Sequence, residues 1–117
     1  MKPEQLLVSR VANYMKVQHT NTPYRFDQID QVGLRGGKRN KAIHGKWSRG
    51  YPDLIVLHRT KKWGALFLEL KVTKTVHDTD HTRRQRAYHK VLKDAGYKVK
   101  FVCGYEEAVK AIDKYMV

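Results

Sequence analysis

The segment PDLIVLHRTKKWGALFLELKV, residues 52–72, decides the fold of this chain. Residues 53–58 are a nearly continuous apolar run, which is the pattern of a strand buried on both faces. The polar connection 59–64 is short enough for a β-hairpin, and residues 65–72 have the composition of a second strand. In that strand the leucines and Val72 share one face, and the other face receives Phe67, Glu69 and Lys71. The segment therefore predicts an antiparallel pair of strands with polar residues at one end.

The flanking segments complete an α/β pattern. Apolar residues recur at helical spacing in three of them, and two others have the composition of strands. The predicted helices are residues 4–17, 82–95 and 105–116, and the predicted strands are residues 24–29 and 98–103. The resulting order is αβββαβα, and a helix between the last two strands implies that they pair in parallel. We therefore expect an α/β fold, with a mixed sheet flanked by helices, in a single domain of residues 1–117.

The composition is strongly basic. The 117 residues include 24 Lys and Arg against 11 Asp and Glu, which gives a net charge of +13 and a pI near 10.0. Such domains commonly bind nucleic acid, because neutralising phosphates releases counterions, although an acidic lipid or an acidic protein also fits the charge alone. No apolar stretch is long enough for a membrane span or a secretory signal. We therefore expect no membrane partner and a cytoplasmic location, in a bacterial cell or a virus-infected host cell.

The cysteine and histidine residues give no indication of a disulfide or a zinc site. Cys103 is the only cysteine, which excludes an internal disulfide and cysteine-based zinc clusters. The spacing of His77, His81 and His89 matches no zinc-ligand pattern with a fourth donor. Solvated or hydrogen-bonded histidines are therefore expected rather than a zinc site.

Two clusters of cations are candidates for nucleic-acid contacts. Residues 33–50 hold five of the eight glycines and no acidic residue. This composition fits either a flexible solvated loop or a phosphate-contacting arm, because glycine N–H groups and cations both suit phosphate. The second cluster begins the helix of residues 82–95, where cations oppose the helix dipole and so indicate DNA binding rather than stability. The candidates are Arg35, Lys38, Arg39, Lys41, Lys46, Arg49, Arg83, Arg84 and Arg86.

Asp53, Glu69 and Lys71 form the candidate site for chemistry. The hairpin reverses the chain, so Asp53 at the start of one strand can lie beside Glu69 at the end of the other. Two adjacent carboxylates repel unless a cation lies between them, and such oxygen ligands suit Mg²⁺ or Mn²⁺. Lys71 shares the face of Glu69, where an ammonium can hold an attacking water or stabilise charge on a phosphate. A Glu–Lys pair alone is common on exposed strands. The hypothesis of a metal site that acts on a phosphate therefore depends on the combination of this pair with Asp53 and with the positive net charge of the chain.

The residues GYPDLIV at 50–56 and LFLELKV at 66–72 resemble the virus-type replication-repair nuclease (VRR-NUC) group of the PD-(D/E)XK nuclease superfamily. The similarity continues with Gln85 and Leu92 on the next helix. It also includes the AGY and EEA motifs, at 95–97 and 106–108, and an early glutamate, Glu4. The resemblance implies a restriction-endonuclease-like fold that cleaves DNA with a divalent metal.

The resemblance also implies roles for individual residues. Lys71 would position the nucleophilic water, and Gln85 would project from its helix towards the same site. From composition alone, Gln85 would be an ordinary helix-surface residue. The implied metal ligands are Asp53, Glu69, the backbone carbonyl of Leu70 and, for a second metal or its waters, Glu4. An acid in a first helical turn is also favoured by the helix dipole, so Glu4 has a purely structural explanation as well.

The implied activity is Mg²⁺- or Mn²⁺-dependent hydrolysis of DNA phosphodiester bonds by an endonuclease. Stand-alone members of the group resemble homodimeric resolvases of four-way (Holliday) junctions, and a symmetric dimer would present two sites to two strands. Two alternatives stay open, namely a flap-cutting or nicking repair nuclease and a non-catalytic DNA-binding module of the same fold. Cleavage of junction, flap and duplex substrates separates the nucleases, whereas salt-sensitive binding without cleavage identifies the module.

Overall fold

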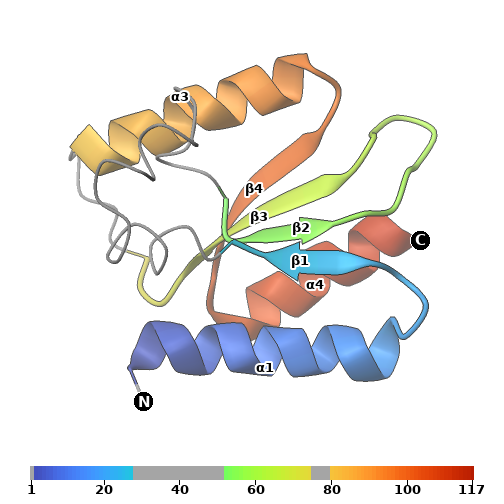
Figure 1. The fold of residues 1–117 in the computed structure, drawn as a ribbon. Coiled ribbons are helices and arrows are strands. Elements are labelled where there is room, and N and C mark those ends of the chain that lie inside the picture. The colour runs from blue at the N-terminus through green and yellow to red at the C-terminus, as the bar shows by residue number, and fades with distance from the viewer. Residues whose placement is uncertain (1, 28–51, 75–79) are drawn as a thin grey trace, which may run out of the picture.

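The computed structural model describes residues 2–27, 52–74 and 80–117. Helices and strands follow the predicted order αβββαβα in these residues (Figure 1). The elements are α1 (Pro3–Gln18), β1 (Tyr24–Phe26), β2 (Leu54–Val56), β3 (Leu66–Lys71), α3 (Asp80–Asp94), β4 (Lys98–Cys103) and α4 (Gly104–Met116). The predicted α/β class is confirmed.

The strands form one mixed sheet in the order β1-β2-β3-β4. β2 pairs antiparallel with β1 and with β3, so the predicted hairpin is confirmed. β3 and β4 pair in parallel, as expected for two strands connected through a helix. In the hairpin Leu54 lies opposite Leu68, and in the parallel pair Glu69 lies opposite Phe101. These two registers determine which side chains meet at the site described below.

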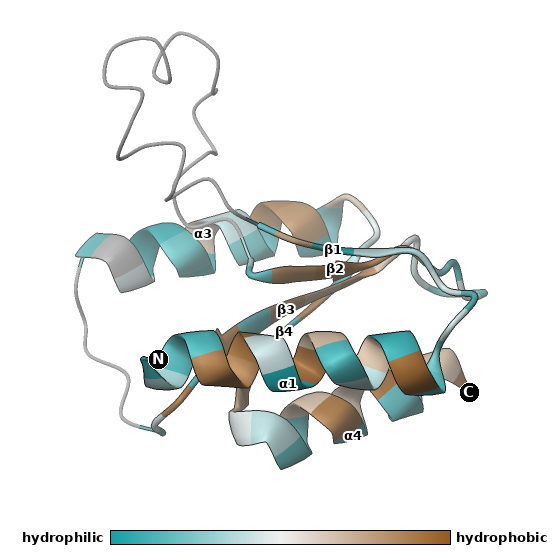
Figure 2. Ribbon diagram, turned by 60° about the horizontal axis from the view of Figure 1, so that its bottom comes forward, coloured by the Kyte–Doolittle hydropathy of each residue, from teal (hydrophilic) through white to brown (hydrophobic). Residues whose placement is uncertain are grey.

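The helices cover the sheet in three layers, with α3 on one face and α1 and α4 on the other (Figures 1 and 2). The hydrophobic core lies between the sheet and the α1–α4 layer, because β3 alternates and its leucines all point there. Its fully buried members are Val11, Met15, Leu54, Val56, Leu66, Leu68, Ala108 and Ile112. Figure 2 shows α3 as mainly hydrophilic, so the α3 face is the one that can carry polar chemistry.

The hairpin strands are shorter than the sequence predicts. β2 comprises three residues, Leu57 after it is 53% exposed, and Ile55 on the α3 face is only partly buried. The expectation of a strand buried on both faces through His58 is therefore wrong. The physical reason is coverage, since α3 packs against β4 and leaves the β2 side of its face more open. The end of the first predicted strand, residues 28–29, lies outside the described residues.

The turn from α3 into β4 has the hydrogen bonds of a Schellman motif. The Tyr97 N–H donates to the Leu92 carbonyl and the Gly96 N–H to the Lys93 carbonyl, each at 3.1 Å. Gly96 has φ +101°, a conformation that L residues rarely adopt, which explains glycine as the stop signal. Its carbonyl accepts a 2.9 Å hydrogen bond from Gly64 N–H, so this turn aligns β4 with the start of β3.

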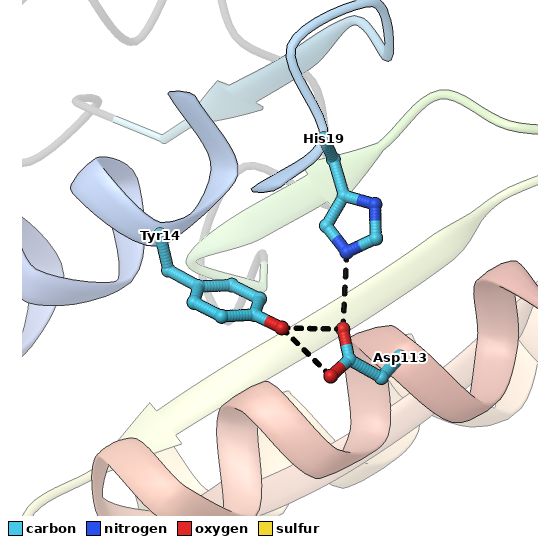
Figure 3. Close-up of polar contacts among 3 residues, drawn as sticks. All are labelled: Tyr14, His19 and Asp113. Atoms are coloured by element: carbon cyan, nitrogen blue, oxygen red, sulfur yellow. Dashed lines mark hydrogen bonds and ion pairs between the residues drawn. The ribbon is translucent and has the colours of Figure 1, made fainter. Parts of the chain in front are cut away.

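A polar cluster holds the end of α1 against α4 (Figure 3). The Tyr14 hydroxyl donates to the Asp113 carboxylate, with both oxygens at 2.7 Å, and His19 Nε2 lies 3.0 Å from Asp113 Oδ1. The hydrogen bond to Asp113 is the largest cause that raises the pKa of Tyr14 to about 12. The Arg10 guanidinium lies over the Tyr105 ring, 4.2 Å from its centroid, and supports the same helix contact.

Candidate active site

The registers place three carboxylates in one row across the sheet. Continuing the Leu54–Leu68 pairing by one residue puts Asp53 opposite Glu69. On the other side, Asp27 N–H donates to the Asp53 carbonyl at 2.8 Å, which extends the β1–β2 ladder. Because side chains alternate along strands, Asp27, Asp53 and Glu69 all belong to the face covered by α3.

Glu69 is a buried acid, with only 2% of its surface exposed. Burial is the main cause that raises its pKa, because it disfavours the charged form. A side-chain hydrogen bond with Asp53 and the negative charge of Asp53 raise the pKa further, whereas the positive charge of Lys71 and a backbone hydrogen bond of Asp53 lower it. Two carboxylates in such close contact are stabilised when a proton or a cation lies between them.

Gln85 joins the acid to the lysine. This side chain is 4% exposed, and its Nε2 donates to Glu69 Oε1. Its Oε1 accepts a 3.1 Å hydrogen bond from Lys71 Nζ. The amide N–H therefore matches the acceptor oxygen of Glu69, and the amide oxygen matches the ammonium donor of Lys71. Sequence composition alone suggested an exposed position for Gln85. The structure instead buries this side chain beside Glu69 and Lys71.

The donor set fits a divalent cation. Asp53 Oδ2 accepts a 2.7 Å hydrogen bond from the Leu70 N–H, which orients the carboxylate towards the end of β3. Carboxylates and a backbone carbonyl are hard oxygen ligands of the kind that Mg²⁺ and Mn²⁺ prefer. The contact between the Glu69 and Asp53 carboxyl groups, beside the single ammonium of Lys71, is the observation that supports the fit, because a divalent cation could replace the proton that such a pair favours.

His89 borders the site, one helical turn after Gln85. Its ring lies 4.6 Å from the Phe101 ring, and the Lys71 ammonium lies 5.6 Å from that same ring. Burial, followed by the charge of Lys71, lowers the pKa of His89 to about 4, so the imidazole is neutral at pH 7. Its Nε2 is buried and has no hydrogen-bond partner among the described residues. The sequence suggested a solvated or hydrogen-bonded histidine, which this nitrogen does not fit.

Asp27 is the residue that the sequence analysis missed. The alternation of Tyr24 and Phe26 was visible, and it already implied that Asp27 points to the opposite face from them. The pKa of Tyr88 on α3 is raised mainly by burial and, to a smaller extent, by the negative charge of Asp27. Among residues 2–27, 52–74 and 80–117, however, no three acids, histidines or cysteines form a group that could hold a metal.

The remaining predicted residues are less closely connected to the site. Glu4 is exposed in the first turn of α1, and the structure does not bring it together with Asp53 and Glu69. The arginines of α3 are exposed, and Arg83 pairs with Asp80 at 2.7 Å. Arg84 and Arg86 are the other two exposed arginines at this end of α3. The candidates Arg35, Lys38, Arg39, Lys41, Lys46 and Arg49 lie outside the described residues.

Comparison with known proteins identifies the fold. Neither a protein-family model nor a curated protein matches the sequence. None of the described helices has the length and hydrophobicity of a membrane span. A solved structure named VRR_NUC domain protein superimposes with a TM-score of 0.75 at 20% sequence identity, over 99% of this chain and 89% of that chain. The chain therefore has the fold of a VRR_NUC domain protein, as its resemblance to that group implied.

Proposed function

We propose that this chain is a divalent-metal-dependent DNA endonuclease of the VRR-NUC type within the PD-(D/E)XK superfamily. One observation carries the proposal, namely the buried hydrogen-bonded chain from Glu69 through Gln85 to Lys71, beside Asp53. Two carboxyl groups contact each other here beside one ammonium, so a divalent cation in place of the shared proton would neutralise both carboxylates, which supports a site built for a metal. The shared fold supports the same assignment.

The proposed metal ligands are Asp53, Glu69 and the backbone carbonyl of Leu70. When bound, a divalent cation supplies Lewis-acid stabilisation of negative charge on the phosphate and on the attacking oxygen. The role of Glu4 at a second metal stays a prediction from the resemblance. The chemistry of the other groups follows from the contacts of this chain's own residues.

Hydrolysis requires a water oxygen to form a bond to phosphorus while the bond to one ester oxygen breaks and that oxygen takes up a proton. Lys71 is suited to orient the water or to stabilise the phosphate charge, because its ammonium donates hydrogen bonds and is held by Gln85. Gln85 acts as a positioning residue, since its amide holds Glu69 and Lys71 in one arrangement. The exposed arginines of α3 and the basic segment 33–50 would bind the DNA backbone.

The test compares the wild type with Lys71→Ala on labelled four-way junction, flap and duplex DNA in Mg²⁺ and Mn²⁺, with EDTA as a control. Lys110→Ala is the matched variant, because it removes one exposed lysine from α4 on the other side of the sheet. We expect Lys71→Ala to lose about 10²-fold or more in cleavage rate. Lys110→Ala should stay within about twofold, and both should bind DNA in EDTA about as well as the wild type.

The two alternatives give different results in the same experiment. Salt-sensitive binding by the wild type without cleavage in either metal would refute the nuclease and leave a DNA-binding module. Preference for flaps or nicked duplex over junctions would refute junction selectivity alone.

Junction resolution further requires a homodimer, in which two sites act on two strands. Light scattering at working concentration measures this directly. A monomer that still cleaves duplex DNA would exclude the resolvase and retain the nuclease.

A further inference from the structure

A basic pocket lies on the α4 face of the sheet, at the opposite end of β3 from Lys71. It has a volume of about 220 Å³. Trp63, Leu66 and Tyr115 supply apolar lining, and three lysines supply charge: Lys98, Lys100 and Lys114. Pockets for drug-sized ligands usually exceed about 300 Å³, so this one suits a single small group such as one phosphate with part of its sugar.

The charge in this pocket is concentrated on three lysines, and no acidic residue is among its lining residues. Burial is the main cause that lowers the pKa of Lys98, and four other lysines lower it further. These lysines belong to the β2–β3 connection, α3, β4 and α4, and they are Lys62, Lys93, Lys100 and Lys114. Every charged group that shifts the pKa of Lys98 is therefore a cation. A bound anion would remove this repulsion.

Trp63 holds two of the ammonium groups near the pocket. Lys62 Nζ lies 5.2 Å and Lys98 Nζ 6.0 Å from its ring centroid. These distances lie within the range in which the negative face of an aromatic ring attracts a cation. Within residues 2–27, 52–74 and 80–117, neither of these two ammonium groups forms an ion pair with a carboxylate, so their charge is available to an external anion.

The pocket is separate from the candidate active site. Lys98 and Lys100 lie opposite Leu66 and Leu68 in the parallel register, and those leucines point into the core beneath α4. Glu69 lies one position further along β3, so it faces α3. A ligand in the pocket would therefore occupy the opposite face of the sheet from Asp53 and Glu69.

We propose that this pocket binds a phosphodiester of a nucleic-acid strand, as a second site on the molecule. A phosphodiester carries one negative charge, whereas three lysines line the pocket and Lys62 lies beside it over Trp63, so a run of phosphates matches the charge better than a lone anion. The partly exposed ring of Trp63 suits the sugar next to that phosphate. The assignment rests on this pocket alone and does not depend on hydrolysis at the other face.

Trp63 provides a direct reporter for binding. The chain has two tryptophans, so a Trp47→Phe background leaves Trp63 as the single emitter. The probe is a thymidine oligonucleotide of about eight nucleotides, in EDTA to prevent cleavage. The pocket variant is Lys98→Gln with Lys114→Gln. The matched control, Lys2→Gln with Lys16→Gln, removes two exposed lysines, one at the N-cap of α1 and one in its last turn.

We expect saturable changes in Trp63 emission with the oligonucleotide. The pocket variant should raise its Kd by about tenfold or more and flatten the dependence of log K on log salt by about 1.4, which corresponds to two lost phosphate contacts on a single strand. The control variant should change Kd by about twofold or less. The pocket variant should also unfold at an unchanged or higher urea concentration, because it removes like charges that repel.

Equal weakening by the pocket and control variants would overturn the proposal, since it would reduce the effect to net charge. Unchanged Trp63 emission on oligonucleotide binding would also overturn it. Thymidine monophosphate distinguishes the source of the phosphate. If the monophosphate saturates the pocket and the oligonucleotide does not, the pocket belongs to a free nucleotide and the assignment to a strand is wrong.

Discussion

Replacing Glu69 by glutamine should make the chain more stable in EDTA while it abolishes metal-dependent cleavage. Burial and Asp53 raise the pKa of Glu69 in the folded state, so the folded chain keeps this proton. The unfolded chain loses it above pH of about 4.3. From that pH through neutrality the unfolded state binds fewer protons, and stability falls as pH rises.

The magnitude follows from this difference in proton binding. Each pH unit is worth about 1.36 kcal/mol, so the Glu69 proton alone lowers stability by up to about 3 kcal/mol between pH 5 and pH 7, measured as the difference between the wild type and a variant without this carboxyl group. Glu69→Gln has no proton to lose and should show no such slope. Its amide keeps an oxygen that can accept the hydrogen bond from Gln85. The variant should therefore match the wild type near pH 5 and exceed it by up to about 3 kcal/mol at pH 7.

Urea unfolding between pH 5 and pH 8, with EDTA or with saturating Mg²⁺, measures both effects. Mg²⁺ at about 100 times its Kd should stabilise the wild type by about 2.7 kcal/mol and Glu69→Gln by much less. Glu106→Gln is the control, since it removes an exposed carboxylate from the first turn of α4. The reasoning fails if Glu69→Gln is less stable than the wild type in EDTA at pH 7, or if it keeps the wild-type slope.

Three further predictions concern two structural contacts away from the site and one residue that borders it. Gly96→Ala should cost about 1–2 kcal/mol in urea unfolding, because φ is +101° at this position, and an unchanged midpoint would contradict the Schellman turn. Asp113→Ala should cost about 1 kcal/mol, because Tyr14 and His19 lose their shared partner, and NMR titration should show the pKa of Tyr14 falling from about 12 towards 10. His89→Phe should be at least as stable as the wild type at pH 7, because it removes a buried nitrogen without a partner among the described residues. Since the pKa of His89 is depressed to about 4, the stability of His89→Phe relative to the wild type should increase as pH falls from about 6.5 towards 4, and a difference that does not change with pH would refute this assignment.

Much of the fold was predictable because its signals are local. The short polar connection at 59–64 predicts the hairpin, and the alternation of β3 predicts which side chains share a face. A helix before the last strand predicts the parallel pair. Element ends were predicted less well, as Leu57 shows, because the exposure of a strand end depends on which helix covers it.

The candidate site was likewise predicted in part, where its signals are local. That Asp53, Glu69 and Lys71 share one end of a hairpin follows from local sequence, because the reversal of the chain and the two-residue repeat of a strand suffice to place them. The resemblance to a nuclease family predicted that Gln85 belongs to the same site. Without that resemblance, a glutamine in this helix would be expected on the surface.

Only the tertiary structure decided the environment of these groups. Burial of Gln85 between Glu69 and Lys71 depends on how α3 packs on the sheet, and the row with Asp27 depends on the pairing of β1 with β2. The lysine pocket likewise gathers residues from three segments that are far apart in the sequence, 60–66, 98–100 and 111–117. The physical reason is that pKa shifts and buried hydrogen bonds depend on non-local distances and on solvent exclusion, which no local pattern of residues encodes.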